Sequence, residues 1–377
     1  QTLTSADGKN WVLGNLAPLT NIAGDYTLQL LANGSGIVGA TPARTLAADA
    51  IDAFRVTATN LTGTANADQY YIRANGDNLE IFTTLPPGAT PTYSSPLDML
   101  TGLSVNSGAG NDVLHIAGTL PLSPAINGGP GSDKLILDSG THSFFNELAG
   151  PWSIEQLDVR SSAAIRFNAS QVLEQLSISG DGSVQLAPSA SRSLTVNQLS
   201  IADNGVLNIH DNGVIVGGMT LADVSALVRS GSGITSALAT NGSYKGIAVI
   251  SNDVGDGTPR KATFYETAVG ASDILVQCVW NGDTNLDGLV NADDYFQVDS
   301  GFVTQKKGYA NGDFNYDDVV NADDYFLIDS SFVGQSGSLA SQTPEALPAD
   351  VVMIRRSSKN TSADSILSQL FSTKPLM

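Results

Sequence analysis

Two acidic segments near the C-terminus carry the residues whose type and spacing could do chemistry. The first segment offers oxygen donors at positions 1, 3, 5, 7, 9 and 12 of a loop, a backbone carbonyl serving at position 7: Asp283, Asn285, Asp287, Leu289, Asn291 and Asp294. The second segment repeats this spacing with Asp313, Asn315, Asp317, Val319, Asn321 and Asp324. A short loop with this spacing can wrap a hard cation, and calcium prefers oxygen ligands. The first loop (residues 283–294) and the second loop (residues 313–324) therefore predict two calcium sites.

The two loops belong to a duplicated unit whose copies lie 30 residues apart. Residues 290–303 and 320–333 are identical at eleven of fourteen positions. Apolar residues after each loop predict a short helix, and two such loop–helix units can share a core that neither forms alone. The alternative is an acidic surface that only faces solvent, but unrelated acidic segments rarely keep this register.

Residues 282–333 resemble a type I dockerin, a paired-loop module with EF-hand-like calcium loops. The resemblance implies that the donors named above are calcium ligands and that the module is small and all-α. Two departures from the family pattern stand out. Asp318 occupies position 6 of the second loop, where glycine is usual and a left-handed turn is needed, so we expect a weaker second site. The Ser-Thr pair through which dockerins usually recognise cohesin is Ala-Asp at residues 292–293 and 322–323, so cohesin binding is not implied.

Two glycine-rich turns farther upstream carry a second calcium-type pattern. Residues 107–114 and 128–135 lie 21 residues apart and resemble the nonapeptide turns of RTX proteins, and residues 63–70 form a degenerate third copy. In RTX proteins the glycines allow tight turns and the aspartate binds calcium. Because 21 residues is about the length of one solenoid coil, we expect Asp112 and Asp133 to lie one above the other, where they could share an ion. The alternative is a purely structural role for these turns.

The chain between the turns and the loops is repetitive and rich in short alternating strands. Residues 154–159, 173–178 and 196–201 align with one another, and a turn-prone cluster and a further strand follow each copy. This period predicts the coils of a parallel β-solenoid, in which each coil buries its apolar face on the next. An antiparallel sandwich is the rival, because alternation alone does not fix strand direction.

The expected fold class is therefore mainly β, with a parallel β-solenoid or β-helix-like region followed by the dockerin-like module. Five regions are expected: the end of an immunoglobulin-like or capping β region (1–60), the solenoid (61–217), an α/β closing region (218–281), the calcium module (282–334), and a linker and tail (335–377). This order of modules resembles large exported proteins of planctomycete-like bacteria.

Composition narrows the class of partner. The formal charge of −19 disfavours binding to nucleic acid and to anionic lipid. No apolar run reaches the length of a membrane span. A calcium module is useful where calcium is plentiful, so we expect an extracellular or cell-surface location. The single cysteine, Cys278, allows no internal disulfide.

The sequence shows no recognisable set of catalytic residues, because none of the three histidines has the spacing of a metal-binding motif or lies beside a nucleophile motif. We therefore expect a structural or adhesive protein of an extracellular assembly and not an enzyme. The expected partners are other protein chains, either copies of this chain or a cohesin-like scaffold. The basic, apolar tail (350–377) is expected to dock on an acidic surface of another protomer. The alternative function is a polysaccharide-binding or -degrading component of a scaffolded complex, with extracellular polysaccharide as its partner.

Overall fold

The structure is a computed structural model of the 377-residue chain, and its described part covers residues 2–4, 6, 12–14, 24–33, 48–56, 60–100, 102–122, 124–150, 153–229, 231, 233–240, 242–337 and 339. Within these residues the chain is mainly β, with a solenoid of about six turns and three α-helices. The tail expected at residues 350–377 lies outside the described residues. No helix in the described part is long and apolar enough to cross a membrane.

Two short antiparallel pairs form the described part of the N-terminal region. β1 (Thr2–Thr4) pairs with β2 (Val12–Gly14), and β3 (Gly24–Leu30) pairs with β4 (Ala50–Val56). Tyr26 stacks on Phe54 across the second pair, with ring centroids 5.7 Å apart. The immunoglobulin-like or capping character expected for residues 1–60 stays a prediction.

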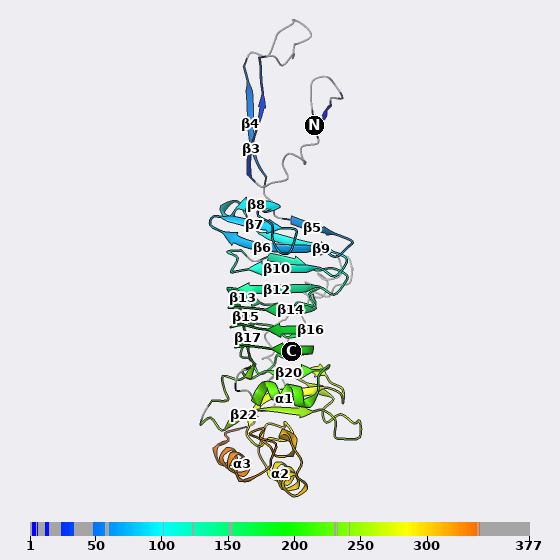
Figure 1. Cartoon of the computed structure of the whole chain (residues 1–377), viewed down its shortest axis with the longest axis vertical. Helices are drawn as coiled ribbons and strands as arrows, with labels where there is room; N and C mark the ends of the chain where they lie inside the picture. Colours follow the sequence, from blue (N-terminus) through cyan, green and yellow to red (C-terminus); the bar gives the residue numbers. More distant parts are fainter. Residues whose placement is uncertain are drawn as a thin grey trace, which may run out of the picture. The chain divides into compact units, whose positions relative to one another are not determined.

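One long sheet runs through all the coils of the solenoid (Figure 1). Its central strands pair in parallel and in chain order: β6 (Gln69–Asn75), β10 (Val113–Ala117), β12 (Lys134–Ser139), β14 (Gln156–Val159), β16 (Gln171–Ile178), β18 (Ser193–Ile201) and β20 (Gly213–Val216). The parallel solenoid predicted from the repeats is confirmed, and the antiparallel sandwich is wrong for these coils.

Two smaller parallel sheets complete the coils. In the first three coils, the strand that precedes the long-sheet strand along the chain belongs to a three-stranded sheet: β5 (Asn60–Thr64), β9 (Leu103–Gly108) and β11 (Pro124–Asn127). From the third coil onward, the strand that follows the long-sheet strand along the chain belongs to a five-stranded sheet: β13 (Thr141–Phe144), β15 (Ala164–Phe167), β17 (Ser183–Leu186), β19 (Val206–Asn208) and β21 (Gly233–Thr235).

The core is a set of apolar columns, each made by residues in the same register on successive strands. Alternate residues of a strand point to the same side, so a parallel register places equivalent side chains directly above one another. Two such columns run inside the long sheet and consist of Tyr70, Leu114, Leu135, Leu157, Leu176 and Leu199, and of Ile72, Ile116, Leu137, Val159, Ile178 and Ile201. Almost all of these side chains are buried, which stabilises the stack through the hydrophobic effect.

Antiparallel strands close both ends of the long sheet. β7 (Asn78–Phe82) pairs with β6 across a tight turn, and β8 (Tyr93–Pro96) and the short helix η1 (Leu97–Met99) follow. At the other end β25 (Ile274–Trp280) lies between β20 and the edge strand β22 (Lys245–Ser251). A small hairpin joins β23 (Thr263–Phe264) to β24 (Thr267–Ala268).

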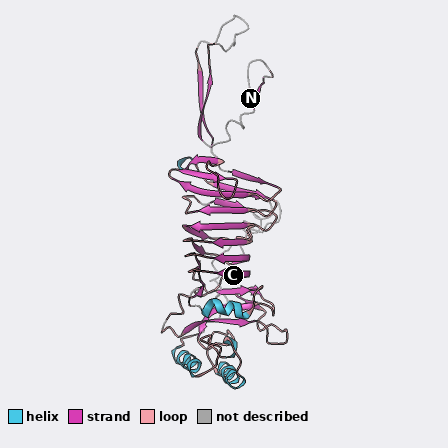
Figure 2. Ribbon diagram, in the orientation of Figure 1, coloured by secondary structure: helices cyan, strands magenta, loops and turns pink. Residues whose placement is uncertain are grey.

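The helices follow the last coils, where Figure 2 shows them in cyan. α1 (Leu221–Arg229) lies in the expected α/β closing region (218–281), and α2 (Ala292–Thr304), η2 (Tyr309–Asn311) and α3 (Ala322–Gly334) belong to the duplicated unit. α2 and α3 start with the same capping box, made by Asn291 with Asp294 and by Asn321 with Asp324. The helices expected after each loop are therefore present.

Candidate functional site

The first loop folds around its own acidic side chains. The buried carboxylate of Asp283 accepts hydrogen bonds from the backbone N–H groups of Asp287 (3.1 Å) and Gly288 (2.8 Å). The side chain of Asn285 also accepts from the Asp287 N–H (2.8 Å), and Asp287 accepts from the Leu289 N–H (2.9 Å). These short-range bonds turn the backbone around Asp283 and keep the oxygen-bearing side chains on the loop itself.

Asp294, the last residue of the first loop, joins the end of this loop to its beginning. Asp294 is fully buried, and its Oδ1 accepts from both the backbone N–H (2.8 Å) and the hydroxyl of Thr284 (2.9 Å). Its Oδ2 accepts from the Asn291 N–H (3.0 Å), which is the capping-box bond at the start of α2. The loop and the helix are thus built from one set of hydrogen bonds, so ordering of one orders the other.

The second loop repeats this arrangement. Asp324 accepts from the N–H groups of Phe314 (2.7 Å) and Asn321 (3.0 Å), and Asn315 and Asp317 make the same two turn bonds as their counterparts. One difference lies at Asp313, whose Oδ2 accepts from the Gly308 N–H (3.2 Å) while its Oδ1 is buried without a hydrogen-bond partner. A buried acceptor without a donor is costly, and a bound cation or a proton would satisfy it.

Burial raises the pKa of every carboxylate at the first and last loop positions. The pKa of Asp283 rises to about 7, chiefly because of burial and further because of the nearby carboxylates of Asp294 and Asp287. Burial also raises the pKa of Asp294, Asp313 and Asp324. Each loop therefore contains two buried acidic groups with no basic partner within hydrogen-bond reach in the described structure, an arrangement that a divalent cation would stabilise.

The donor chemistry of the loops suits calcium, since it consists of carboxylate, amide and backbone oxygens without any nitrogen or sulfur ligand. However, among the described residues no three His, Cys, Asp or Glu side chains lie together in a way that could hold a metal ion. Each loop holds two buried aspartates, and its remaining predicted donors are a third aspartate, asparagine side chains and a carbonyl. The residues would hold calcium only with the position-5 aspartate, Asp287 or Asp317, turned toward the buried pair.

The glycine-rich turns use their carboxylates in a different way. Asp112 and Asp133 lie one above the other, as predicted, and Oδ1 of Asp133 accepts from the Asp112 N–H (2.7 Å). Oδ1 of Asp112 accepts in turn from the N–H of Asp68 (2.7 Å), and Glu155 accepts from the N–H of Asp133 (2.8 Å). We call these four residues the carboxylate ladder. Each step joins one coil to the next through a charged acceptor.

The glycines of these turns are required by the close approach of successive coils. A Cβ atom at Gly129 would lie 1.7 Å from the carbonyl oxygen of Gly108, and one at Gly131 would lie 1.7 Å from that of Gly110. Oδ2 of Asp112 and of Asp133 is buried without a hydrogen-bond partner, and burial raises the pKa of Asp133 to about 6. Stacking therefore explains the glycines and one oxygen of each aspartate, and whether the turns bind calcium stays a prediction.

A contact that the sequence did not indicate joins the second loop to the end of the solenoid. The buried hydroxyl of Tyr316 donates to the carbonyl of Ile247 (2.7 Å) and accepts from the N–H of Val249 (2.9 Å), both on the free edge of β22. Arg229 of α1 forms an exposed ion pair with Asp318 at position 6 of the same loop (3.2 Å). The only sequence signal was an apolar residue at position 4 of each loop, Leu286 or Tyr316, and both are buried.

The segment expected as a linker begins in contact with the module. The side chain of Gln335 bonds to both the N–H and the carbonyl of Val290 (2.8 Å each), and Trp280 donates to the carbonyl of Gly337 (3.2 Å). The N–H of Leu339 donates to the carbonyl of Gly288 in the first loop (2.8 Å). The described residues from 335 onward therefore hold the first loop against β25.

The two helices of the duplicated unit expose equivalent apolar side chains. These are Phe296, Phe302 and Val303 on α2 and Phe326, Phe332 and Val333 on α3, each more than half exposed. Between the helices Tyr295 donates to Asp329 (2.6 Å) and Tyr325 to Asp299 (2.5 Å). The duplication therefore produces two similar apolar patches on one module, which we call the paired helix face.

Comparisons with known proteins gave no match: no family model fits the chain, and no curated protein or solved structure matches it significantly. The resemblance to dockerins and to RTX turns therefore depends on the residues of the loops and turns themselves.

Proposed function

We propose that this chain is a calcium-binding structural or adhesive protein of an extracellular assembly. Its solenoid serves as the rigid body and its duplicated C-terminal unit as a calcium-ordered attachment module. The observation that carries the proposal is the repeated placement of two buried carboxylates in each loop, Asp283 with Asp294 and Asp313 with Asp324. Burying two anions together without a cation costs free energy, so these loops favour occupancy by a divalent ion.

Calcium would act by ordering the module. Asp294 and Asp324 are both loop residues and capping residues of α2 and α3, so an ion that fixes the loop also fixes the start of the helix. An ion that binds only the folded state stabilises that state by about 2.7 kcal/mol at a hundred times its Kd. The proposal includes an extracellular or cell-surface location, because free calcium is plentiful there.

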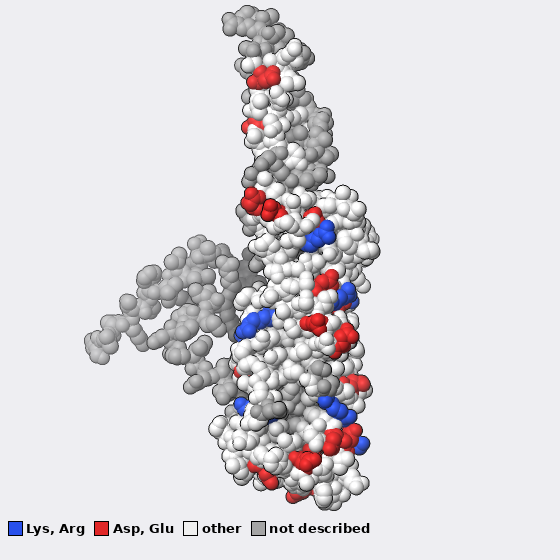
Figure 3. Space-filling view, turned by 60° about the vertical axis from the view of Figure 1, so that its left-hand side comes forward, with Lys and Arg blue, Asp and Glu red and all other residues white. Residues whose placement is uncertain are grey.

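The paired helix face supplies the attachment surface of the proposal. Exposed aromatic residues such as Phe296 and Phe326 are common anchors of protein–protein contacts, and α2 and α3 present one each at equivalent positions. The face drawn in Figure 3 shows no basic patch that would suit nucleic acid, because the Lys and Arg side chains (blue) are few and are scattered among Asp and Glu (red). Other protein chains are therefore the partners proposed, whether copies of this chain or a scaffold.

The experiment is sedimentation velocity with negative-stain imaging of the purified chain, in millimolar calcium and again in chelator. Ordered oligomers or fibres that dissolve on chelation are the expected result. The double variant Asp283→Asn with Asp313→Asn should behave in calcium as the wild type does in chelator. The matched control is Asp293→Asn with Asp323→Asn, which removes the same charge from exposed positions outside the predicted ligand sets.

Substitution of the apolar patches separates attachment from calcium binding. Phe296→Ser with Phe326→Ser should abolish assembly while calcium binding is retained, and Val254→Ser, at an exposed residue outside the module, should leave both unchanged. A compact monomer in calcium and in chelator alike would contradict the assembly proposal.

A further inference from the structure

A discontinuity interrupts the solenoid at its third coil. The five-stranded sheet begins at β13 of this coil, so in the described structure β13 has no strand beside it from the preceding coil. The strands β10 and β12 of the long sheet pair in parallel at the same level. Where a strand above β13 would be expected, residues 118–122 instead form a loop from β10 toward β11. We call the space between this loop, β11 and β13 the seam.

β13 presents hydrogen-bonding groups to the seam. Its carbonyls at Gly140 and Phe144 accept from Ala164 and Asn168 on the β15 side, so the even-numbered residues face β15. In a parallel ladder the intervening residues face the opposite edge. Thr141 confirms this direction, because its N–H donates to the hydroxyl of Thr119 in the seam loop (2.9 Å). The N–H and carbonyl of Ser143 therefore face the seam, with no backbone partner among the described residues.

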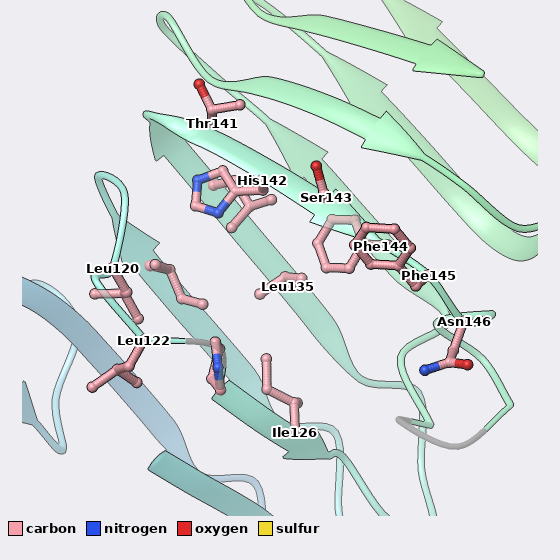
Figure 4. Close-up of a pocket in the computed structure, with 13 residues that line it drawn as sticks. Leu120, Leu122, Ile126, Leu135, Thr141, His142, Ser143, Phe144, Phe145 and Asn146 are labelled. Carbon is pink, nitrogen blue, oxygen red and sulfur yellow. The ribbon is translucent and has the colours of Figure 1, made fainter. Parts of the chain in front are cut away.

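A cavity of about 240 Å³ opens beside this edge. Figure 4 shows Leu120, Leu122 and Ile126 on one side of it and His142, Phe144 and Phe145 on the other. Leu135 and Leu137 of the core columns form part of its wall, so the cavity reaches the interior of the coil. No Asp, Glu, Lys or Arg is among the described residues that line it.

His142 marks the place where one core column is interrupted. In the following coils its register position is occupied by Ile165, Val184, Leu207 and Ile234, all buried. One ring nitrogen, Nε2, lies 2.9 Å from the carbonyl of Ser139, which fixes it as the donor and leaves Nδ1 as an acceptor. This column of equivalent residues is therefore apolar except at His142, its first member.

We propose that the seam binds an extended polypeptide segment of a partner, which adds a short parallel strand to β13 and places one large apolar side chain in the cavity. Strand addition to a sheet edge takes its affinity from main-chain hydrogen bonds and its specificity from pockets for alternate side chains. The seam combines both features within residues 141–146. A cavity of about 150 Å³ holds benzene, so this one accommodates a phenyl or isobutyl group.

A free apolar ligand is less well suited to the seam than a peptide. It would fill the cavity but make no use of the outward N–H and carbonyl of Ser143, which would stay hydrogen-bonded to solvent. Phe145, 73% exposed at the rim, would be covered by a strand lying along β13 and left exposed by a small molecule. The segment must be uncharged where it enters, because the cavity offers no counter-ion.

The test is selection from a displayed library of eight-residue peptides in which every second position varies among apolar residues. The wild-type chain serves as bait, and Leu122→Trp, which fills the cavity, serves as the counter-selection bait. Selected peptides are resynthesised, with and without N-methylation of their backbone, and titrated against the full chain by fluorescence anisotropy. Circular dichroism and thermal melting check that each variant is folded.

Five results are expected. Leu122→Trp and Ser143→Pro, which removes the edge N–H, each weaken binding at least tenfold, while Ser143→Thr, which keeps it, binds as the wild type does. N-methylation of the peptide weakens binding at least tenfold. Hydrogen exchange at the amides of Ser143 and Phe145 slows when peptide is bound. In the wild-type protein, a peptide that binds without slowing exchange there overturns the proposal, as does a library with no member that prefers the wild type to Leu122→Trp.

Discussion

The glycine-rich turns and the C-terminal loops contain similar acidic patterns but use their carboxylates differently. In the turns, Asp133 accepts from the N–H of Asp112 one coil away, so the acidic group joins two coils. In the loops, Asp283 accepts from the N–H groups of residues four and five positions later in the same loop. The turns depend on their neighbours for their shape, whereas each loop is shaped by its own side chains.

This difference indicates where a cation has a role. A turn held by its neighbouring coils keeps its geometry without an ion, since stacking of the glycines and the carboxylate ladder already determine it. In the described structure, the buried carboxylates of each loop accept their hydrogen bonds from the duplicated unit itself and not from a solenoid coil. Calcium is therefore proposed for the loops, and a structural role accounts for most of what the turns show.

The largest effect should come from a side chain added between the stacked turns. Gly129→Ala places a Cβ atom 1.7 Å from the Gly108 carbonyl oxygen, and its φ of 92° is already unfavourable for alanine. We expect the free energy of unfolding to fall by about 3 kcal/mol or more, measured by urea denaturation. The control is Gly118→Ala, with a similar φ of 89° but no atom closer to the added Cβ than the Ser139 hydroxyl at 3.8 Å, which should cost about 1 kcal/mol. Equal losses in the two variants would show that the stacking is not tight.

A smaller loss should follow removal of the hydroxyl that joins the second loop to β22. Tyr316→Phe leaves the buried N–H of Val249 and the carbonyl of Ile247 without their partner, which costs about 2 kcal/mol. Tyr295→Phe removes an exposed hydrogen bond and should cost about 0.5 kcal/mol. Thermal melting of both variants in calcium checks this order, and a reversed order would mean that the module is not held by Tyr316.

Asp133→Asn tests whether the ladder works without a charge. Burial raises the pKa of Asp133 to about 6, so its folded form holds a proton more tightly than its unfolded form. Its contribution is therefore fully favourable below about pH 4 and is lost as pH rises through 6. In chelator at pH 7.5 the variant should be about 1 to 2 kcal/mol more stable than the wild type, with no difference at pH 4.

The matched control for that comparison is Asp256→Asn, an exposed aspartate whose replacement should change stability by less than about 0.5 kcal/mol at either pH. If Asp133→Asn instead lowers the stability measured in calcium and reduces the calcium bound, the turns bind an ion as the RTX resemblance implies.

The smallest effect concerns position 6 of the two loops. Asp318 has a φ of 71°, which glycine adopts without strain, and Gly288 occupies the equivalent position of the first loop with a φ of 89°. Asp318→Gly should stabilise the chain by about 0.5 kcal/mol and raise the calcium affinity of the second loop a few-fold. Arg229→Ala, which removes only the exposed ion pair, should have little effect on either quantity. Lower affinity in Asp318→Gly would mean that the carboxylate itself assists binding.

Much of the solenoid was predictable because its repeats carry their register in the sequence. Leu157, Leu176 and Leu199 lie at equivalent positions of the three aligned segments, and they are directly paired in the structure. A repeat of coil length with one apolar residue at the same place predicts a stack, because each coil must bury that residue on the next. The stacking of Asp112 on Asp133 followed from their spacing in the same way.

The breaks in the repeat could not be predicted from local pattern. The seam arises because the loop after β10 replaces a strand. Gly118 and Pro121 are typical of a loop, but they do not indicate that the edge of β13 then has no strand beside it. β25 runs antiparallel to β20, and this could not be predicted because alternation does not determine strand direction. The contact of Tyr316 with β22 joins residues 67 and 69 positions apart, and only the folded chain brings them together.

The most direct test of the central claim is the number of calcium ions bound per chain, measured by isothermal titration of the full protein after removal of metal. Two ions should bind to the wild type, and none should bind to the Asp283→Asn with Asp313→Asn variant, while Asp293→Asn with Asp323→Asn keeps both. No bound calcium in the wild type, or an unchanged number in the loop variant, would contradict the account.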